Sequence, residues 1–129
     1  MPSVGPLNMT IIEINKLLAE YGHCYLRNFD SKSCDLLLEF EADGGPYEVS
    51  NVKVTFHDAR TFHLPRVFHA VIQLRQASIQ EMSALIPSIS YDKSDGGNCF
   101  LIQVKEQNTS YYVWAEKFSV KDIPEFHKP

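Results

Sequence analysis

The chain is short of cysteine and glycine, and it has no long apolar run. Its 129 residues include 3 cysteines and 6 glycines. The apolar cluster at residues 36–38 is far shorter than the roughly 20 residues that a membrane-spanning helix needs. The N-terminal residues also lack the positive region and the apolar stretch of a signal peptide. We therefore expect no membrane association, no export and a cytoplasmic location.

The cysteines support the same location. Cys24, Cys34 and Cys99 are an odd number and form no short pairing motif. Free thiols are typical of a reducing compartment, whereas secreted domains of this size usually carry paired cysteines. We expect all three to be unbridged.

An excess of basic residues is missing as well. The chain has 12 lysines and arginines against 16 acidic residues, which gives a formal net charge of −4. Proteins of this size that bind nucleic acids usually neutralise phosphates with a basic face. Only Arg60, Arg66 and Arg75 come near to forming a cluster. We expect no nucleic-acid partner.

Motifs for cofactors and for nucleophilic catalysis are also absent. Neither a glycine-rich phosphate loop nor a Gly-x-Ser-x-Gly sequence occurs. The segment that begins at Asp92 resembles a calcium loop only faintly, because Gln103 stands where a bidentate glutamate is needed. The sequence predicts no cofactor and no metal ion.

What is present indicates one globular domain. Hydrophobic residues make up 44% of the chain and charged residues 22%, which is typical of folded proteins. The length is that of one domain. We expect a single domain over residues 1–129, with loose tails at 1–8 and 124–129.

Two segments carry helix signals. Thr10 and Glu13 have the spacing of a capping box, and apolar residues follow at helical spacing up to Tyr21. Gly22 is a natural stop. Ser78 and Glu81 repeat the capping pattern before a short middle helix. We predict helices over 11–21 and from 79 to the proline at 87.

Strand patterns occupy most of the remaining chain. Hydrophobic and polar residues alternate over 23–29, 34–42, 51–57, 98–106 and 111–118, with turn residues at 30–33, 43–46, 95–97 and 107–110. Between Phe62 and Leu74 the apolar residues occupy even-numbered positions, which favours strands on either side of Pro65. A helix over 67–76 remains the alternative for the stretch at 66–76.

The connections between these strands are short, so neighbouring strands should be antiparallel. The acidic outer face of the strand at 34–42 lies opposite Lys53 in this interpretation. The predicted fold is α+β: an antiparallel β-meander sheet of about five or six strands, with the N-terminal helix packed on it and a short middle helix.

Three histidines spaced by six residues are the main candidates for chemistry. Six residues of a strand span roughly 20 Å, too far for His57, His63 and His69 to share a metal ion. A chain reversal near Pro65 would still bring His57 and His69 together. His57, Asp58 and His69 are therefore weak candidates for a catalytic or ligand-binding site.

Aromatic residues crowd the strand at 111–118. Alternation places Tyr112, Trp114 and Phe118 on one face and Tyr111 on the other, so both faces are hydrophobic. Either the monomer covers both faces itself, or one of them binds a partner. Tyr111, Tyr112, Trp114 and Phe118 are the interface candidates, for a homodimer or for another protein.

Two functions remain open. The tetrapeptide at 56–59, Phe-His-Asp-Ala, resembles a short sequence found in several small bacterial proteins, including some of the toxin-immunity type. With the acidic charge, this favours a non-enzymatic protein-interaction module of immunity or regulatory type. The alternative is a small enzyme or ligand-binding protein with a pocket between helix and sheet that uses His57, Asp58 and His69. Convergence of these three side chains in a cleft would favour the alternative.

Overall fold

The structure is a computed structural model, and it describes residues 8–41, 51–85, 98–104 and 111–122. Several sequence predictions lie outside these residues. They are the tail at 124–129, nearly all of the tail at 1–8, the end of the middle helix, and the turns at 43–46, 95–97 and 107–110.

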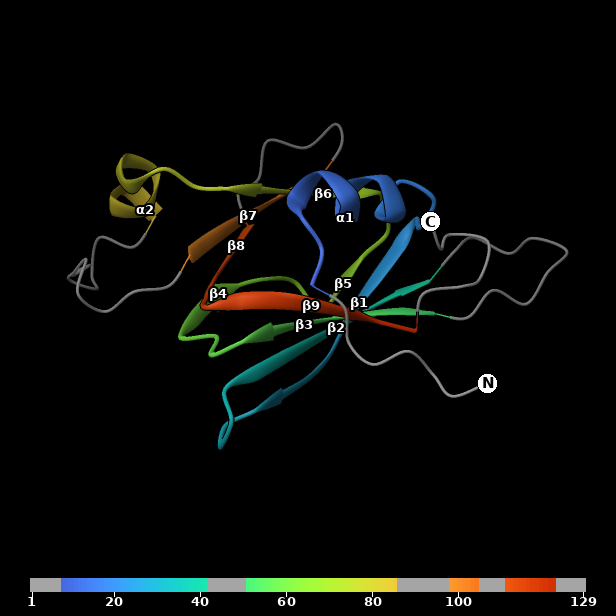
Figure 1. Ribbon diagram of the computed structural model, residues 1–129, viewed down its shortest axis with the longest axis horizontal. Helices are drawn as coiled ribbons and strands as arrows, with labels where there is room; N and C mark the ends of the chain where they lie inside the picture. Colours follow the sequence, from blue (N-terminus) through green and yellow to red (C-terminus); the bar gives the residue numbers. More distant parts are fainter. Residues whose placement is uncertain (1–7, 42–50, 86–97, 105–110, 123–129) are drawn as a thin grey trace, which may run out of the picture.

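The described residues form two helices and nine strands (Figure 1). Helix α1 spans Ile11–Leu18 and α2 spans Ile79–Leu85. The strands are β1 His23–Asp30, β2 Asp35–Glu41, β3 Val52–His57, β4 Thr61–His63, β5 Val67–Phe68, β6 Ile72–Gln76, β7 Asn98–Val104, β8 Tyr111–Ala115 and β9 Lys117–Lys121.

The strands build two sheets with antiparallel pairing. One has the order β5-β1-β2-β3-β9 and the other the order β4-β8-β7-β6. The α+β class with antiparallel sheets is therefore confirmed. The single meander sheet is wrong, because the strands divide between two sheets, and only the runs β1-β2-β3 and β6-β7-β8 are neighbours in both sequence and space.

The two sheets arise because long strands bend. Between β3 and β4, Asp58 adopts a positive φ of 53°. The Glu116 amide donates to the His57 carbonyl at 2.8 Å, and the Arg60 amide donates to the Trp114 carbonyl at 2.8 Å. These bonds pair the bend after β3 with the bend between β8 and β9. The antiparallel pair β3–β9 of one sheet therefore continues as the pair β4–β8 of the other sheet.

This bend changes the predicted faces of the strand at 111–118. The predicted strand divides at Glu116 into β8 and β9, and the alternation of inward-facing residues shifts by one position there. Val113 belongs to the main core before the bend and Phe118 after it, while Trp114 points to the other side of its sheet. The prediction that Phe118 shares a face with Tyr112 and Trp114 is wrong for this reason.

The stretch at 62–74 is extended, as its even-numbered apolar pattern predicted. β5 pairs with β1 and β6 pairs with β7, so this segment also passes from one sheet to the other. The helix alternative over 67–76 is wrong. The chain passes from one sheet to the other between β3 and β4, between β4 and β5, between β5 and β6, and between β8 and β9.

The main core lies between the two sheets. The rings of Phe56, Phe100 and Phe118 meet there at centroid distances of 5.4–6.0 Å. The predicted inward residues of β2 and β3 are all buried, namely Leu36, Leu38, Phe40, Val52, Val54 and Phe56. Alternation was therefore sufficient to predict the core face of these strands.

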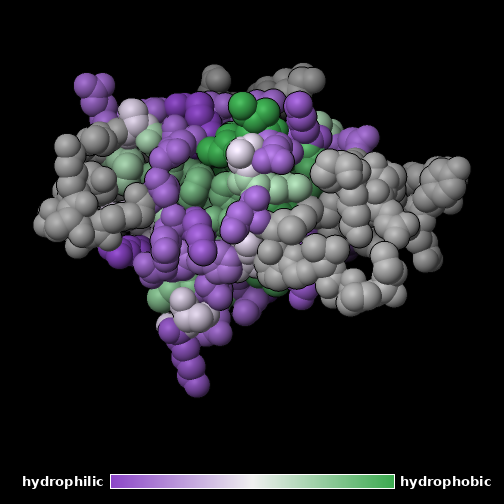
Figure 2. All heavy atoms as spheres, in the orientation of Figure 1, coloured by the Kyte–Doolittle hydropathy of each residue, from purple (hydrophilic) through white to green (hydrophobic). Residues whose placement is uncertain are grey.

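Helix α1 lies beside β6 (Figure 1). Its capping box is present: the Thr10 hydroxyl accepts from the Glu13 amide, and the Glu13 carboxylate accepts from the Thr10 amide. Ile14, Leu17 and Leu18 are buried in the main core, while Ile12 is 70% exposed. Figure 2 shows hydrophobic residues gathered over α1 and the strands beneath it.

Helix α2 covers a second, smaller core on the other side of the four-stranded sheet. Met82 packs there with Cys99 and Trp114. The Ser78 hydroxyl accepts from the Glu81 amide at 3.2 Å, and the Glu81 carboxylate accepts from the Ser78 amide at 3.0 Å, as the capping pattern predicted. Neither of the described helices is long and apolar enough to cross a membrane.

Candidate functional site

The outward surface of the five-stranded sheet carries an ordered set of polar side chains, which we call the polar face. Alternate residues of β2, β3 and β9 point to it, and the strand register aligns them in three rows. The rows are Asp35–His57–Lys117, Leu37–Thr55–Ser119 and Glu39–Lys53–Lys121.

His57, the last residue of β3, contacts both neighbouring strands at one end of this face. Its Nδ1 lies 3.3 Å from Oδ1 of Asp35 on β2, and its Nε2 lies 2.7 Å from Oγ of Ser119 on β9. The imidazole therefore connects three strands in one line of hydrogen bonds. With the ring proton on Nδ1, His57 donates to Asp35 and accepts the Ser119 hydroxyl proton at Nε2.

Exposure differs along this line. The side chains of Asp35 and His57 are 40% and 31% exposed, whereas Ser119 is buried. Solvent and other molecules therefore reach the carboxylate and the imidazole more easily than the hydroxyl.

Ion pairs hold two further charged side chains of the face in place, Glu39 and Lys53. Arg27 donates to Glu39 at 2.9 and 3.1 Å and lies 4.7 Å from the centre of the Tyr25 ring. Lys53 donates to Asp122 at 2.8 Å, and this hydrogen bond raises the pKa of Lys53. Many side chains of the polar face are therefore already oriented before any partner arrives.

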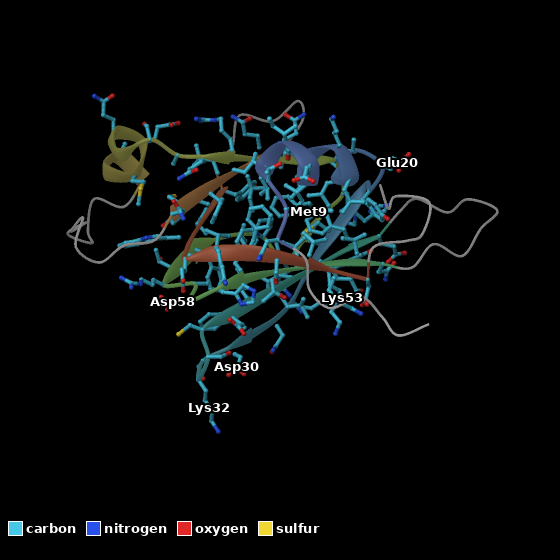
Figure 3. All side chains as sticks on the ribbon, viewed as in Figure 1. Met9, Glu20, Asp30, Lys32, Lys53 and Asp58 are labelled. Carbon is cyan, nitrogen blue, oxygen red and sulfur yellow. The ribbon has the colours of Figure 1, made fainter. Side chains whose placement is uncertain are left out.

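The structure does not bring the three predicted site residues together. Asp58 sits in the bend after β3, where its Oδ2 lies 3.6 Å from Nε of Arg60. Figure 3 shows Asp58 and Lys53 toward opposite ends of the sheet. His69 follows β5, and β1 and β2 separate β5 from β3. His57 is thus joined to Asp35 and Ser119, while His69 meets His23, with the two Nδ1 atoms 3.3 Å apart.

Asp35 and Ser119 were not predicted as site residues. The sequence did contain a signal for Asp35, because the acidic face of the strand at 34–42 was predicted to lie opposite Lys53. Glu39 is the residue that pairs with Lys53, and the same register continued along both strands places Asp35 opposite His57. Ser119 gave no such signal, because its position depends on the bend at Glu116 that brings β9 beside β3.

The chain itself covers much of the predicted aromatic interface. Trp114 is buried against Met82 and Cys99, and Phe118 is buried in the main core. Tyr111 and Tyr112 are half-buried, and the exposed His63 ring stacks on them at centroid distances of 5.9 and 6.2 Å. Of the four candidates, only the two tyrosines keep a substantial exposed surface.

The cysteines are free thiols, and two of them are buried. Burial raises the pKa of Cys24 to about 12 and that of Cys99 to about 11. A thiol needs a lowered pKa to act as a nucleophile near neutral pH, so neither buried cysteine is suited to that role.

Neither a protein-family model, nor a curated protein, nor a solved structure matches the chain. Among the described residues, no three histidine, cysteine, aspartate or glutamate side chains form a ready-made metal site. Function is therefore inferred from the polar face and its chemistry.

Proposed function

We propose that this protein is a non-enzymatic protein-interaction module of the cytoplasm, without nucleic-acid or membrane partners. Its binding surface in this proposal is the polar face. One observation carries the proposal: on this face, acidic and basic side chains are sorted onto different strands. The unbridged thiols agree with a reducing compartment.

The sorting follows the strand order. Asp35 and Glu39 belong to β2, whereas Lys117 and Lys121 belong to β9. β3 lies between these two strands. Each acidic residue shares a row with one of the lysines, so β2 and β9 carry opposite charges at matching positions along the strands.

Such a face is complementary to a second copy of itself. Consider two copies packed face to face, with a two-fold axis that runs along β3. The rotation places β2 of each copy over β9 of the other and keeps the rows aligned. Asp35 then faces Lys117 of the second copy, and Glu39 faces Lys121 of the second copy. A homodimer is therefore the partner that the charges favour.

The residues near the axis do not oppose this arrangement. Lys53 lies on β3, so the rotation brings it toward Lys53 of the second copy. Each of these lysines is neutralised by Asp122 of its own chain at 2.8 Å. Because the face is mainly polar, we expect a weak dimer that dissociates as salt screens the charges.

Charge reversal tests this proposal by sedimentation velocity at low and high salt. Lys117→Glu/Lys121→Glu should abolish the dimer, as should Asp35→Lys/Glu39→Lys. Mixing these two variants should restore association, because β2 and β9 are then both acidic in one copy and both basic in the other. Lys16→Glu/Lys32→Glu is the matched control, since it changes the net charge equally at exposed positions away from the face.

Two results would contradict the proposal. One is a monomer at every protein concentration in low salt. The other is a dimer that the control variant weakens as strongly as the variants of the polar face do. Circular dichroism of each variant establishes that the fold is retained.

A second function is supported by the line Asp35–His57–Ser119. These residues have the hydrogen-bond order of a hydrolase triad, with distances of 3.3 and 2.7 Å. Once a substrate gains access to the buried hydroxyl, Ser119 Oγ would attack an acyl carbon while its proton passes to His57 Nε2, and Asp35 would stabilise the imidazolium. His57 would return the proton to the leaving group, and water would then hydrolyse the acyl-serine.

A fluorophosphonate probe distinguishes the two functions. A hydrolase should be labelled at Ser119, identified by mass spectrometry, and His57→Gln should abolish the labelling. Thr55→Ala, which removes the neighbouring hydroxyl of the same row, should leave it intact. The absence of label on the folded protein would contradict the hydrolase function and leave the interaction module as the proposal.

A further inference from the structure

Two histidines meet at the end of the five-stranded sheet away from His57. β1 and β5 pair through Cys24 with Phe68 and Tyr25 with Val67, and the next position of this register places His23 opposite His69. Their Nδ1 atoms are 3.3 Å apart, and their rings meet edge to face at an interplanar angle of 80°. His69 is exposed and His23 is half-buried, so a small ion reaches both rings from solvent.

The separation of the two nitrogens is that of two ligands on one tetrahedral ion. Zinc–nitrogen bonds of roughly 2.0–2.1 Å place neighbouring ligands about 3.3–3.4 Å apart. We propose that His23 and His69 bind a divalent transition-metal ion of the zinc class through their Nδ1 atoms. This site is independent of the polar-face proposal.

Glu41 supplies a third ligand in this proposal. It pairs with His23 across β1 and β2, so Glu41, His23 and His69 form one row on the same face of the sheet. The described residues contain no ready-made group of three ligands, so the Glu41 carboxylate must rotate toward the two rings. Water completes the shell, and with two ligands in place we expect micromolar rather than structural affinity.

A shared hydrogen bond is the competing explanation of the 3.3 Å contact. In that case one Nδ1 carries a proton and the other accepts it. Metal binding requires both Nδ1 lone pairs, so the donating ring must move its proton to Nε2. This tautomer change needs no other reactant, and the two explanations differ in whether the pair binds an ion at all.

Calorimetric titration with zinc chloride at neutral pH tests the site. The wild-type protein should bind one equivalent, and His23→Gln and His69→Gln should each weaken the affinity by at least about tenfold. Glu41→Gln should weaken it by a smaller factor. His63→Gln is the matched control, because it removes an exposed histidine that lies on the other sheet.

Cobalt substitution gives a second readout. Co²⁺ bound by the two imidazoles and the carboxylate should give the intense visible absorption of a tetrahedral complex, which His69→Gln should abolish. The proposal is overturned if the wild-type protein binds no zinc at millimolar concentration. It is equally overturned if His69→Gln and His63→Gln lower the affinity by the same factor. Thermal melts of each variant exclude unfolding as the cause.

Discussion

The side chain of Asn15 in α1 hydrogen-bonds both backbone groups of Leu74 in β6. Its Nδ2 donates to the Leu74 carbonyl at 2.9 Å, and the Leu74 amide donates to its Oδ1 at 2.8 Å. On its other side, β6 pairs with β7. Asn15 therefore takes the place of a neighbouring strand at the open edge of β6, so that a helix, rather than another strand, covers this edge.

Asn15→Ala should lower the free energy of unfolding by about 1–3 kcal/mol, because the amide and carbonyl of Leu74 lose their partner in a partly buried position. Urea denaturation followed by circular dichroism measures the change. Asn28→Ala, at an exposed position of β1, should have little effect. Equal unfolding midpoints for the two variants would show that the contact adds nothing to stability.

Two substitutions on opposite sides of α1 test how the helix packs. Leu18 is fully buried, so Leu18→Asp places an unpaired carboxylate in the core and should cost several kcal/mol, on the order of 3–5. Ile12 is 70% exposed, and Ile12→Asp should leave the melting temperature nearly unchanged. If Leu18→Asp had the same melting temperature as the wild type, this side of the helix would not face the core.

Local sequence patterns predicted the elements but not the way the sheets divide. Both capping boxes form, because their four residues contact one another within a single turn. The inward faces of β2 and β3 follow from alternation alone. Helix α1 ends at Leu18 rather than at Tyr21, and Tyr21 is buried in the core.

The bends escaped prediction because they depend on contacts between distant segments. Asp58 adopts its positive φ where the amide of Glu116 reaches the His57 carbonyl, 59 positions along the chain from His57 (116 − 57). No pattern near either residue indicates this contact. Ser119 reaches His57 only because of this bend, so the site could be predicted in part, through His57, but not as the line Asp35–His57–Ser119.

The charge of Glu81 should persist to a lower pH than that of an ordinary glutamate. The guanidinium of Arg75 at 2.6 Å, together with the Ser78 amide, lowers the pKa of Glu81 to about 2. Because this folded-state pKa is below the ordinary value, the unfolded chain binds more protons in acid. The stability from Glu81 is therefore present above about pH 4.3 and is lost as the pH falls toward 2.

Carbon-13 NMR titration of the Glu81 carboxyl group checks this prediction. The midpoint should lie near 2 in the wild type and should rise in Arg75→Gln, since the largest cause of the shift is then removed. Arg66→Gln, an exposed arginine on another part of the chain, should leave the midpoint of Glu81 unchanged. An ordinary midpoint in the wild type would contradict the ion pair.

The thiols should divide into one reactive and two protected groups. Cys34 is half-buried, whereas Cys24 and Cys99 are buried, with pKa values raised to about 12 and about 11. At pH 8, a pKa of about 12 leaves on the order of one thiolate in ten thousand molecules. Ellman's reagent should therefore modify one thiol quickly in the native protein, and Cys34→Ser should remove this fast phase.

Unfolding in the absence of reductant should then release all three thiols. The count distinguishes protection by burial from protection by a disulfide, because burial is lost on unfolding and a covalent bond is not. One thiol after unfolding would mean that two cysteines are bridged, which would contradict both the free thiols of the structure and the cytoplasmic location proposed above. Three thiols, two of them slow in the native state, would agree with Cys24 in the main core between the sheets and Cys99 in the smaller core under α2.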